Sequence, residues 1–194
     1  MLNSKQDLRT DEGLMLAYRD GDGAAFEALY ARWRGPLYRY FLRQCGHAGQ
    51  ADELYQDVFM RVIHAAAGYE PTAKFATWLF RIAHNRLVDH WRKAGRDPVD
   101  PPPSGEDGDD CEFDPPAPEG GAPDREAERK QLGAALLAAL NSLPELQREA
   151  FLLAEEGGLT LEEVASVCGV GRETIKSRLR YATEKLRHKL ESWR

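Results

Sequence analysis

The sequence predicts an all-α protein made of two small helical domains joined by a flexible linker. Apolar residues recur at three- and four-residue steps on both sides of one central stretch, as in amphipathic helices. That stretch, residues 95–124, is rich in Pro, Gly, Asp and Glu and holds ten carboxylates against one base, Arg96. Its few apolar side chains cannot offset the entropy lost on ordering, so we expect a disordered acidic tether. The predicted domains are therefore residues 1–94 and 125–194.

The first domain is predicted to begin with two helices, at residues 11–19 and 24–45. The Gly-Asp-Gly sequence at 21–23 separates them, and Asp22 can cap the second helix. Apolar side chains along the second helix predict one wide buried stripe. Pro36 lies inside this pattern, so we expect it to kink or split the helix.

A third helix is predicted at residues 51–66, after a short turn at 47–50. Leu54, Val58 and the segment 60–63 are expected on its buried side. The helix dipole alone favours acidic side chains at a helix start, so the opening turn needs no function beyond capping and solvation. That turn is polar and acidic, with Asp52, Glu53, Gln56 and Asp57.

The last helix of the first domain is predicted at residues 75–91, after a loop at 68–74. It combines apolar side chains, two Trp among them, with several bases. Residues 74–93 hold five Lys and Arg side chains against a single acid, Asp89. The segment is therefore a candidate for contact with an anionic partner.

The second domain is predicted to open with helices at residues 125–143 and 145–154. Pro144 separates them, because proline cannot continue a helix. Gly157-Gly158 ends the second of the two.

The clearest motif of the sequence follows. Thr160 and Glu163 have the spacing of a capping box at the start of a helix. The Cys-Gly-Val-Gly sequence at 168–171 then predicts a tight turn, and a basic helix begins at Arg172. This is the helix-turn-helix pattern, whose second helix enters the major groove of DNA. The alternative is a helical hairpin whose basic face is only solvated.

The net charge of −6 argues at first sight against a nucleic-acid partner. The acid, however, is concentrated in the linker, while each domain has a basic segment. Charge averaged over the chain is therefore a poor guide to its partners.

Several classes of protein are disfavoured. No segment is apolar and long enough to insert in a membrane, and the N-terminus resembles neither a signal peptide nor a presequence, so we expect a cytoplasmic protein. The three cysteines lack CxxC spacing, which argues against a disulfide framework or a structural zinc site. The five histidines are scattered, with no HExxH motif and no phosphate-binding loop, so we expect no catalytic residue, metal or cofactor. The cysteines are Cys45, Cys111 and Cys168.

Three segments resemble bacterial RNA polymerase sigma factors of the extracytoplasmic-function (ECF) group. The promoter −35-binding region of that group is similar to residues 143–187, LPELQREAFLLAEEGGLTLEEVASVCGVGRETIKSRLRYATEKLR. Its core-polymerase-binding helix is similar to residues 51–66, ADELYQDVFMRVIHAA, and its −10-recognition helix to residues 75–93, FATWLFRIAHNRLVDHWRK. The resemblance implies an N-terminal bundle of sigma region 2 type and a C-terminal helix-turn-helix domain of sigma region 4 type. The group also has a linker between these regions.

The resemblance implies roles for individual residues. Core polymerase binding falls on Glu53, Leu54, Gln56 and Asp57. Contact with the −10 element falls on Tyr69, Thr77, Trp78, Arg81, Asn85, Arg86, Arg92 and Lys93. Within that set Asn85 would pair with a flipped-out base, Tyr69 would stack on an unpaired base, and the bases would hold phosphates. Trp78 is equally compatible with a core position.

Contact with the −35 element is implied for one face of the last helix, with Arg172, Glu173, Lys176, Ser177, Arg178, Arg180 and Tyr181. Tyr181 stands where relatives often carry Arg, which leaves the −35 sequence open. An extended Pro-rich linker of this length reaches ~90 Å. It can span the ~70 Å between two sites two turns apart on DNA.

The implied partners are core RNA polymerase, promoter DNA and an anti-sigma factor, with no small-molecule substrate, no cofactor and no membrane insertion. Three alternatives remain open at this point. A helix-turn-helix regulator that is not a polymerase subunit would leave the basic, Trp-containing helix at 75–91 unexplained. An enzyme lacks a recognisable catalytic motif, and a protein that only sequesters another factor has no use for a basic recognition helix.

Overall fold

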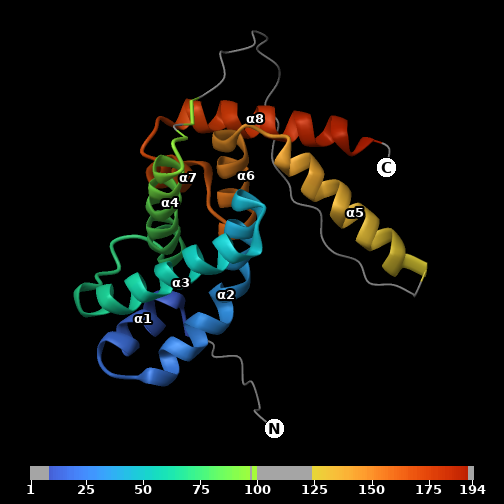
Figure 1. Cartoon of the computed structure of the whole chain (residues 1–194). Helices are drawn as coiled ribbons and strands as arrows, with labels where there is room; N and C mark the ends of the chain where they lie inside the picture. Colours follow the sequence, from blue (N-terminus) through green and yellow to red (C-terminus); the bar gives the residue numbers. More distant parts are fainter. Residues whose placement is uncertain (1–8, 97, 100–123, 192–194) are drawn as a thin grey trace.

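The structure, a computed structural model, describes residues 9–96, 98–99 and 124–191. These residues form eight α-helices and one 3₁₀ turn, with no strand among them (Figure 1). The predicted all-α class is therefore confirmed. Most of the predicted acidic tether lies outside the described residues, and so does Cys111.

Five helical elements form the N-terminal part, which comprises residues 9–96. They are α1 (Asp11–Arg19), α2 (Gly23–Cys45), α3 (Ala48–Ala65), the 3₁₀ turn η1 (Ala66–Gly68) and α4 (Phe75–Lys93). Four helices form the C-terminal part, which comprises residues 124–191. They are α5 (Asp124–Asn141), α6 (Glu145–Gly157), α7 (Leu161–Cys168) and α8 (Arg172–Lys189).

Several helix ends form as their sequence predicts. The Asp22 side chain accepts a hydrogen bond from the Ala25 N–H at 3.2 Å and so caps α2. At α7 both bonds of the capping box are present: Thr160 Oγ1 accepts from the Glu163 N–H at 3.3 Å, and Glu163 Oε2 accepts from the Thr160 N–H at 2.9 Å. Gly158 ends α6 in the left-handed conformation, with a φ of 61°.

Two expectations about helix boundaries need correction. Of the kink or split expected at Pro36, the split does not occur, because α2 is continuous over Gly23–Cys45. This helix is held by packing against α1, α3 and α6, and such tertiary contacts outweigh the loss of one backbone hydrogen bond. The turn predicted at 47–50 is also absent, because α3 already begins at Ala48, with His47 as its N-cap residue.

The buried face of α3 also differs from the prediction. Leu54, Val58 and Val62 are buried as expected, together with Phe59. Met60 and Ile63, however, are 52% and 37% exposed. A continuous apolar run leaves the period of the helix ambiguous, and here Phe59 takes the inward position.

Aromatic contacts join helices at the partly exposed edge of the N-terminal core. Phe26 lies against Tyr18, with ring centroids 4.7 Å apart, while Tyr30 and Tyr55 meet Phe59 edge-on at 4.9 and 5.1 Å. Such tilted and edge-on contacts are the arrangements that aromatic rings favour. They join α1, α2 and α3 into one bundle.

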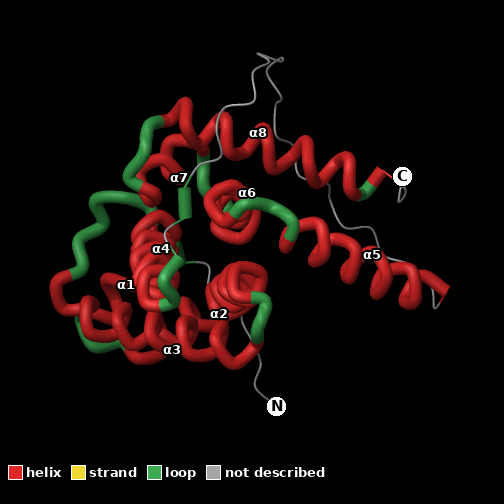
Figure 2. Tube along the Cα trace, turned by 45° about the horizontal axis from the view of Figure 1, so that its top comes forward, coloured by secondary structure: helices red, strands yellow, loops and turns green. Residues whose placement is uncertain are grey.

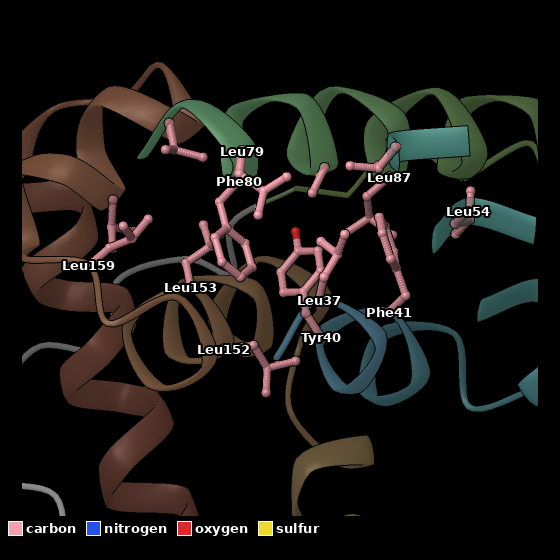
Figure 3. Close-up of a cluster of buried hydrophobic side chains, with 14 of the residues drawn as sticks. Leu37, Tyr40, Phe41, Leu54, Leu79, Phe80, Leu87, Leu152, Leu153 and Leu159 are labelled. Carbon is pink, nitrogen blue, oxygen red and sulfur yellow. The ribbon is translucent and has the colours of Figure 1, made fainter. Parts of the chain in front are cut away.

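The two parts share one hydrophobic core instead of forming separate ones. Figure 2 shows α6 beside α2 and α4 on one side and α8 on the other, and α7 also contacts α4. In the buried cluster of Figure 3, Leu152, Leu153 and Leu159 of the C-terminal part join side chains of the N-terminal part, among them Leu37, Tyr40 and Phe80. We call this contact the inter-part interface. At Gly157 the approach is so close that an added Cβ would lie 3.1 Å from the Phe80 ring.

Candidate nucleic-acid and partner interfaces

One face of α3 combines polar and apolar side chains. Glu53 and Gln56 are exposed in its first turns, and Met60 and Ile63 follow at helical spacing. These four side chains therefore lie on one side of the helix. Leu54, which was expected to contact the polymerase, is only 1% exposed and supports α3 from within.

Arg86 connects α4 to the acidic start of α3. Its Nε donates to Asp57 Oδ2 at 2.7 Å, and one guanidinium nitrogen lies 3.7 Å from Glu53 Oε1. The Arg86 side chain is buried, and it was expected to hold a DNA phosphate. In this arrangement it positions two carboxylates of the predicted polymerase-binding turn instead.

A polar stripe runs along α4. Trp78, Arg81, Asn85 and Arg92 recur at three-, four- and seven-residue steps and so share one face. Arg81, Asn85 and Arg92 are exposed, as is the neighbouring Lys93, and Trp78 is partly buried. An exposed amide flanked by guanidinium groups can read a base edge while the cations contact phosphates.

Two residues expected at this surface are inside the protein. Tyr69 is 3% exposed, and its ring packs edge-on against Trp78 with the centroids 5.0 Å apart. Burial raises the pKa of Tyr69 to about 12. Thr77 is buried as well, and neither its hydroxyl nor that of Tyr69 has a hydrogen-bond partner. Stacking of Tyr69 on a base would require the Tyr69–Trp78 contact to open.

The helix-turn-helix of the C-terminal part is formed by α7 and α8. Gly169, with a φ of 67°, ends α7 in the left-handed conformation, which a residue with a Cβ rarely adopts. The exposed face of α8 carries four of the predicted contact residues, with Arg180 and Tyr181 partly exposed beside them. The four are Arg172, Glu173, Lys176 and Ser177.

Two side chains on α8 differ from a simple recognition surface. Arg178 is buried, so it lies among the side chains that hold α8 in place. The Arg180 guanidinium lies 5.0 Å from the Tyr181 ring centroid and donates to the Tyr181 hydroxyl at 3.2 Å. Tyr181 thus orients a cation next to the recognition face.

Charged side chains link the two parts across the inter-part interface. Lys74 Nζ lies 3.0 Å from Glu163 Oε1, and Arg96 lies 2.9 Å from Glu145 Oε1. Glu156 accepts from both Arg39, at 2.8 Å, and Arg43. His84 Nδ1 lies 2.6 Å from Glu149 Oε1. In each of these pairs the base belongs to the N-terminal part and the acid to the C-terminal part.

Hydrogen bonds between a charged and a neutral side chain accompany these pairs. Arg81 of α4 donates to Ser166 Oγ of α7 at 2.7 Å. The buried Arg148 donates to Gln44 Oε1 at 3.2 Å, and the buried Tyr40 hydroxyl donates to Glu149 Oε1 at 3.1 Å. The sequence singled out Arg81, for DNA, but none of the other residues in these hydrogen bonds. The one available signal was the polar run 147–149, which lies on the buried side of α6.

Among the described residues no helix is long and apolar enough to cross a membrane.

Comparisons with known proteins point to one family. Two family models match the chain: Sigma-70 region 2 over residues 29–97, and Sigma-70, region 4 over residues 133–186. The ECF RNA polymerase sigma factor RpoE of Cereibacter sphaeroides is 37% identical over 185 residues, which cover 92% of this chain and 94% of that protein.

Solved structures show the same fold. CnrH, solved in complex with the cytosolic domain of CnrY, matches with a TM-score of 0.65 at 25% identity, over 94% of this chain and 97% of its own. The sigma factor RpoE of Bartonella quintana, solved with the anti-sigma factor NepR, matches with a TM-score of 0.62 at 23% identity, over 87% of this chain and 98% of its own.

Proposed function

This chain belongs to the ECF group of bacterial RNA polymerase sigma factors, and from that premise we propose how its residues divide the work of promoter recognition. As a sigma factor it binds core RNA polymerase and promoter DNA and directs transcription initiation. The observation that carries the proposal is the presence in one chain of two separate exposed surfaces with basic and polar side chains, the polar stripe on α4 and the exposed face of α8.

The N-terminal part reads and helps to open the −10 element. Asn85 pairs with the edge of an unpaired base, and Trp78, the partly exposed aromatic residue of the stripe, stacks beside it. Arg81, Arg92 and Lys93 contact the phosphates around them. Tyr69 and Arg86 act mainly as supports in the closed arrangement, by which we mean the structure with the two parts in contact across the inter-part interface, because both residues are buried there.

The C-terminal part reads the −35 element with α8. Lys176 and Ser177 lie exposed in the middle of that face and reach base edges in the major groove. Arg172 and Arg180 flank them and contact phosphates. Arg178 is buried and contributes by positioning α8.

Core polymerase binds along the exposed face of α3. Glu53 and Gln56 supply a polar end that suits a basic partner, and Met60 and Ile63 supply an apolar end. Met60 and Ile63 thereby take the apolar role that the sequence assigned to Leu54, which is buried.

The two parts separate when the protein binds a promoter. Arg81 and Ser166 are 2.7 Å apart, so α4 and α7 touch in this structure. Two DNA sites two helical turns apart are ~70 Å distant. The closed arrangement therefore cannot place α4 and α8 on both promoter elements at once, and it represents the protein before it engages DNA.

An anti-sigma factor is a further partner of this chain, by analogy with the B. quintana protein solved with NepR. We propose that it acts on the closed arrangement. The chain contributes no catalytic residue, and nucleotide transfer belongs to the polymerase. Because the polymerase and the promoter DNA that it binds are in the cytoplasm, we propose that this chain acts there.

The proposal is tested by run-off transcription with purified core polymerase on a promoter library. We expect start-site-specific transcripts that depend on this chain and fall at least ~5-fold in Asn85→Ala or Lys176→Ala, since each loses about 1–3 kcal/mol of base discrimination. Gln131→Ala, at an exposed position on α5, is the matched control and should transcribe normally.

One result would overturn the proposal. If core polymerase gained no activity while the chain alone bound DNA sequence-specifically, the protein would be a helix-turn-helix regulator acting without being a polymerase subunit.

A further inference from the structure

Three metal-ligating side chains meet where the two parts touch. His84 comes from α4, Glu149 from α6 and Cys168 from the end of α7. One ligand atom of each lies within 4.8 Å of the other two. Because the three residues come from three helices and from both parts, no local spacing motif could have indicated the cluster.

Glu149 is the unusual member of this cluster. It is fully buried, and a buried carboxylate is costly unless its oxygens are paired. Its Oε1 has two neighbours, the Tyr40 hydroxyl at 3.1 Å and His84 Nδ1 at 2.6 Å. Its Oε2 is buried without any hydrogen-bond partner. A cation would satisfy the second oxygen.

The donor set favours one class of metal. A thiolate, an imidazole and a carboxylate are the three ligand types that Zn²⁺ uses in proteins. Harder cations such as Mg²⁺ and Ca²⁺ prefer oxygen ligands alone, which this cluster does not offer. His84 and Cys168 are partly exposed, so water can reach a fourth position of a tetrahedral site.

We propose that His84, Glu149 and Cys168 bind one Zn²⁺ and that the metal bridges the N-terminal and C-terminal parts. The ligand atoms need only small shifts to reach zinc–ligand distances of about 2.0–2.3 Å. Tyr40 orients Glu149 through its hydrogen bond and completes the site from α2.

Binding exchanges protons for the metal. Burial and the neighbouring Glu149 carboxylate raise the pKa of the Cys168 thiol, so without zinc the sulfur is protonated. Zn²⁺ bonds to the thiolate and the thiol proton goes to solvent. No electron is transferred, and each bound ion neutralises charge around the buried carboxylate.

The consequence for the protein rests on the proposed function. If transcription requires the two parts to separate, a metal held by ligands from both parts stabilises the inactive, closed arrangement. Zinc would then act as an inhibitor of this sigma factor.

The site is tested by titrating Co²⁺ and then Zn²⁺ into the reduced full-length chain. We expect one Co²⁺ per chain, with the visible bands of a four-coordinate site and the near-ultraviolet absorption of a thiolate–cobalt bond, and we expect Zn²⁺ to displace it. Cys168→Ser should abolish the thiolate absorption. Each of Cys168→Ser, Glu149→Gln and His84→Gln should weaken Zn²⁺ binding by more than ~100-fold, which is beyond the ~10-fold expected for Tyr40→Phe, because Tyr40 only orients a ligand.

Matched variants separate this site from other thiols. Cys45→Ser and Cys111→Ser, which alter the cysteines outside the cluster, should leave the absorption and the affinity unchanged. Thiolate absorption that survives Cys168→Ser, or the absence of a stoichiometric site in the wild type, would overturn the proposal. Full Zn²⁺ affinity in His84→Gln would show that the N-terminal part contributes no ligand. That result would overturn the proposal that the metal bridges the two parts.

A second measurement needs neither polymerase nor promoter. Ligand binding to the folded state raises its stability, so Zn²⁺ should raise the unfolding temperature of the wild type and of Cys45→Ser but not of Cys168→Ser. Because this readout is independent of transcription, the zinc site can fail while the sigma function stands, and the reverse.

Discussion

The interior of the N-terminal part and the inter-part interface are built differently. The interior is filled by apolar side chains from α1 to α4, and at its edge the Tyr18–Phe26 and Tyr55–Phe59 contacts bring ring centroids to about 5 Å. The interface has apolar contacts too, but it also buries Glu149, Arg148 and Gln44. Glu149 and Gln44 each retain a buried polar atom without a partner.

This difference indicates that the inter-part interface opens more easily than the interior of the N-terminal part. Apolar packing gains stability without demanding an exact polar partner, whereas buried polar groups are stabilising only when all are satisfied. When the parts separate, water can hydrate the interface groups and recover part of the lost energy. The interior of the N-terminal part has few buried polar groups beside its apolar side chains, the Thr77 and Tyr69 hydroxyls among them, so hydration recovers less energy there. We therefore expect that interior to stay folded while the interface opens.

The largest effect is expected from Leu54→Ala, which attacks the apolar interior. Leu54 is buried, so truncation should lower the free energy of unfolding by about 2–5 kcal/mol. Urea denaturation followed by circular dichroism measures it. Met60→Ala on the same helix is exposed and should change stability by less than about 0.5 kcal/mol. Equal losses in both variants would contradict the orientation of α3.

A smaller effect is expected from Thr160→Ala, which removes the capping box of α7. Loss of such a cap costs about 0.5–2 kcal/mol. Glu163 also pairs with Lys74, so this variant should weaken both the C-terminal part and the inter-part interface. Thr160→Ser keeps the hydroxyl and should behave as the wild type in thermal unfolding. A Thr160→Ala variant of unchanged stability would mean that the cap does not stabilise α7.

Glu156→Gln should act on the interface alone. It removes the charge that Arg39 and Arg43 share, and we expect the closed arrangement to lose about 0.5–1 kcal/mol because the arginines remain partly hydrated. Small-angle scattering should show a larger radius of gyration, with unchanged helix content. The neighbouring Glu155→Gln is the control, since Glu155 is more exposed than Glu156. Loss of helix content in Glu156→Gln would show that the interface and the interiors are not separable.

The smallest effect is expected from the protonation of His90, a partly buried residue of α4. Burial, followed by the charges of Arg96 and Arg86, lowers the pKa of His90 from its ordinary value of 6.5. The unfolded chain therefore takes up this proton at a higher pH than the folded chain does. The contribution of His90 to the free energy of unfolding is therefore complete above pH 6.5. It falls as the pH drops below that value and levels off below the folded-state pKa.

Urea titrations at neutral and acidic pH measure this loss. His90→Gln should remove this component of the pH dependence, whereas His47→Gln, at an exposed position, should retain it. An unchanged pH profile in His90→Gln would assign the acid sensitivity to other groups.

Local signals predicted much of the fold, because they act within one helix. The capping residues Asp22 and Thr160 and the glycines after α6 and α7 define helix ends by short-range hydrogen bonds and backbone conformation. The exposure of Asn85 and Lys176 also follows from helical periodicity. In contrast, Pro36 does not split α2, because packing around the helix outweighs a local preference.

Contacts between distant residues could not be predicted in the same way. The Tyr40–Glu149 hydrogen bond joins residues 109 positions apart and leaves no periodic trace in the sequence. The family resemblance assigned Arg86 and Arg178 to DNA, yet both are buried, which is uncommon for arginine. Whether such a base faces solvent or a buried neighbour depends on tertiary packing.

In the ion pairs named above, the base lies in the N-terminal part and the acid in the C-terminal part. When the interface opens, these bases can therefore exchange one anionic partner for another. Glu163 and Glu156 hold Lys74, Arg39 and Arg43 in the closed arrangement. Any polyanion that reaches these cations competes with the carboxylates for the same positions, by mass action. The basic side chains would exchange their carboxylate partners for phosphates. Little net charge is then left uncompensated, and few small ions need be released. The entry of DNA should therefore depend less steeply on salt than its contacts with free cations would suggest.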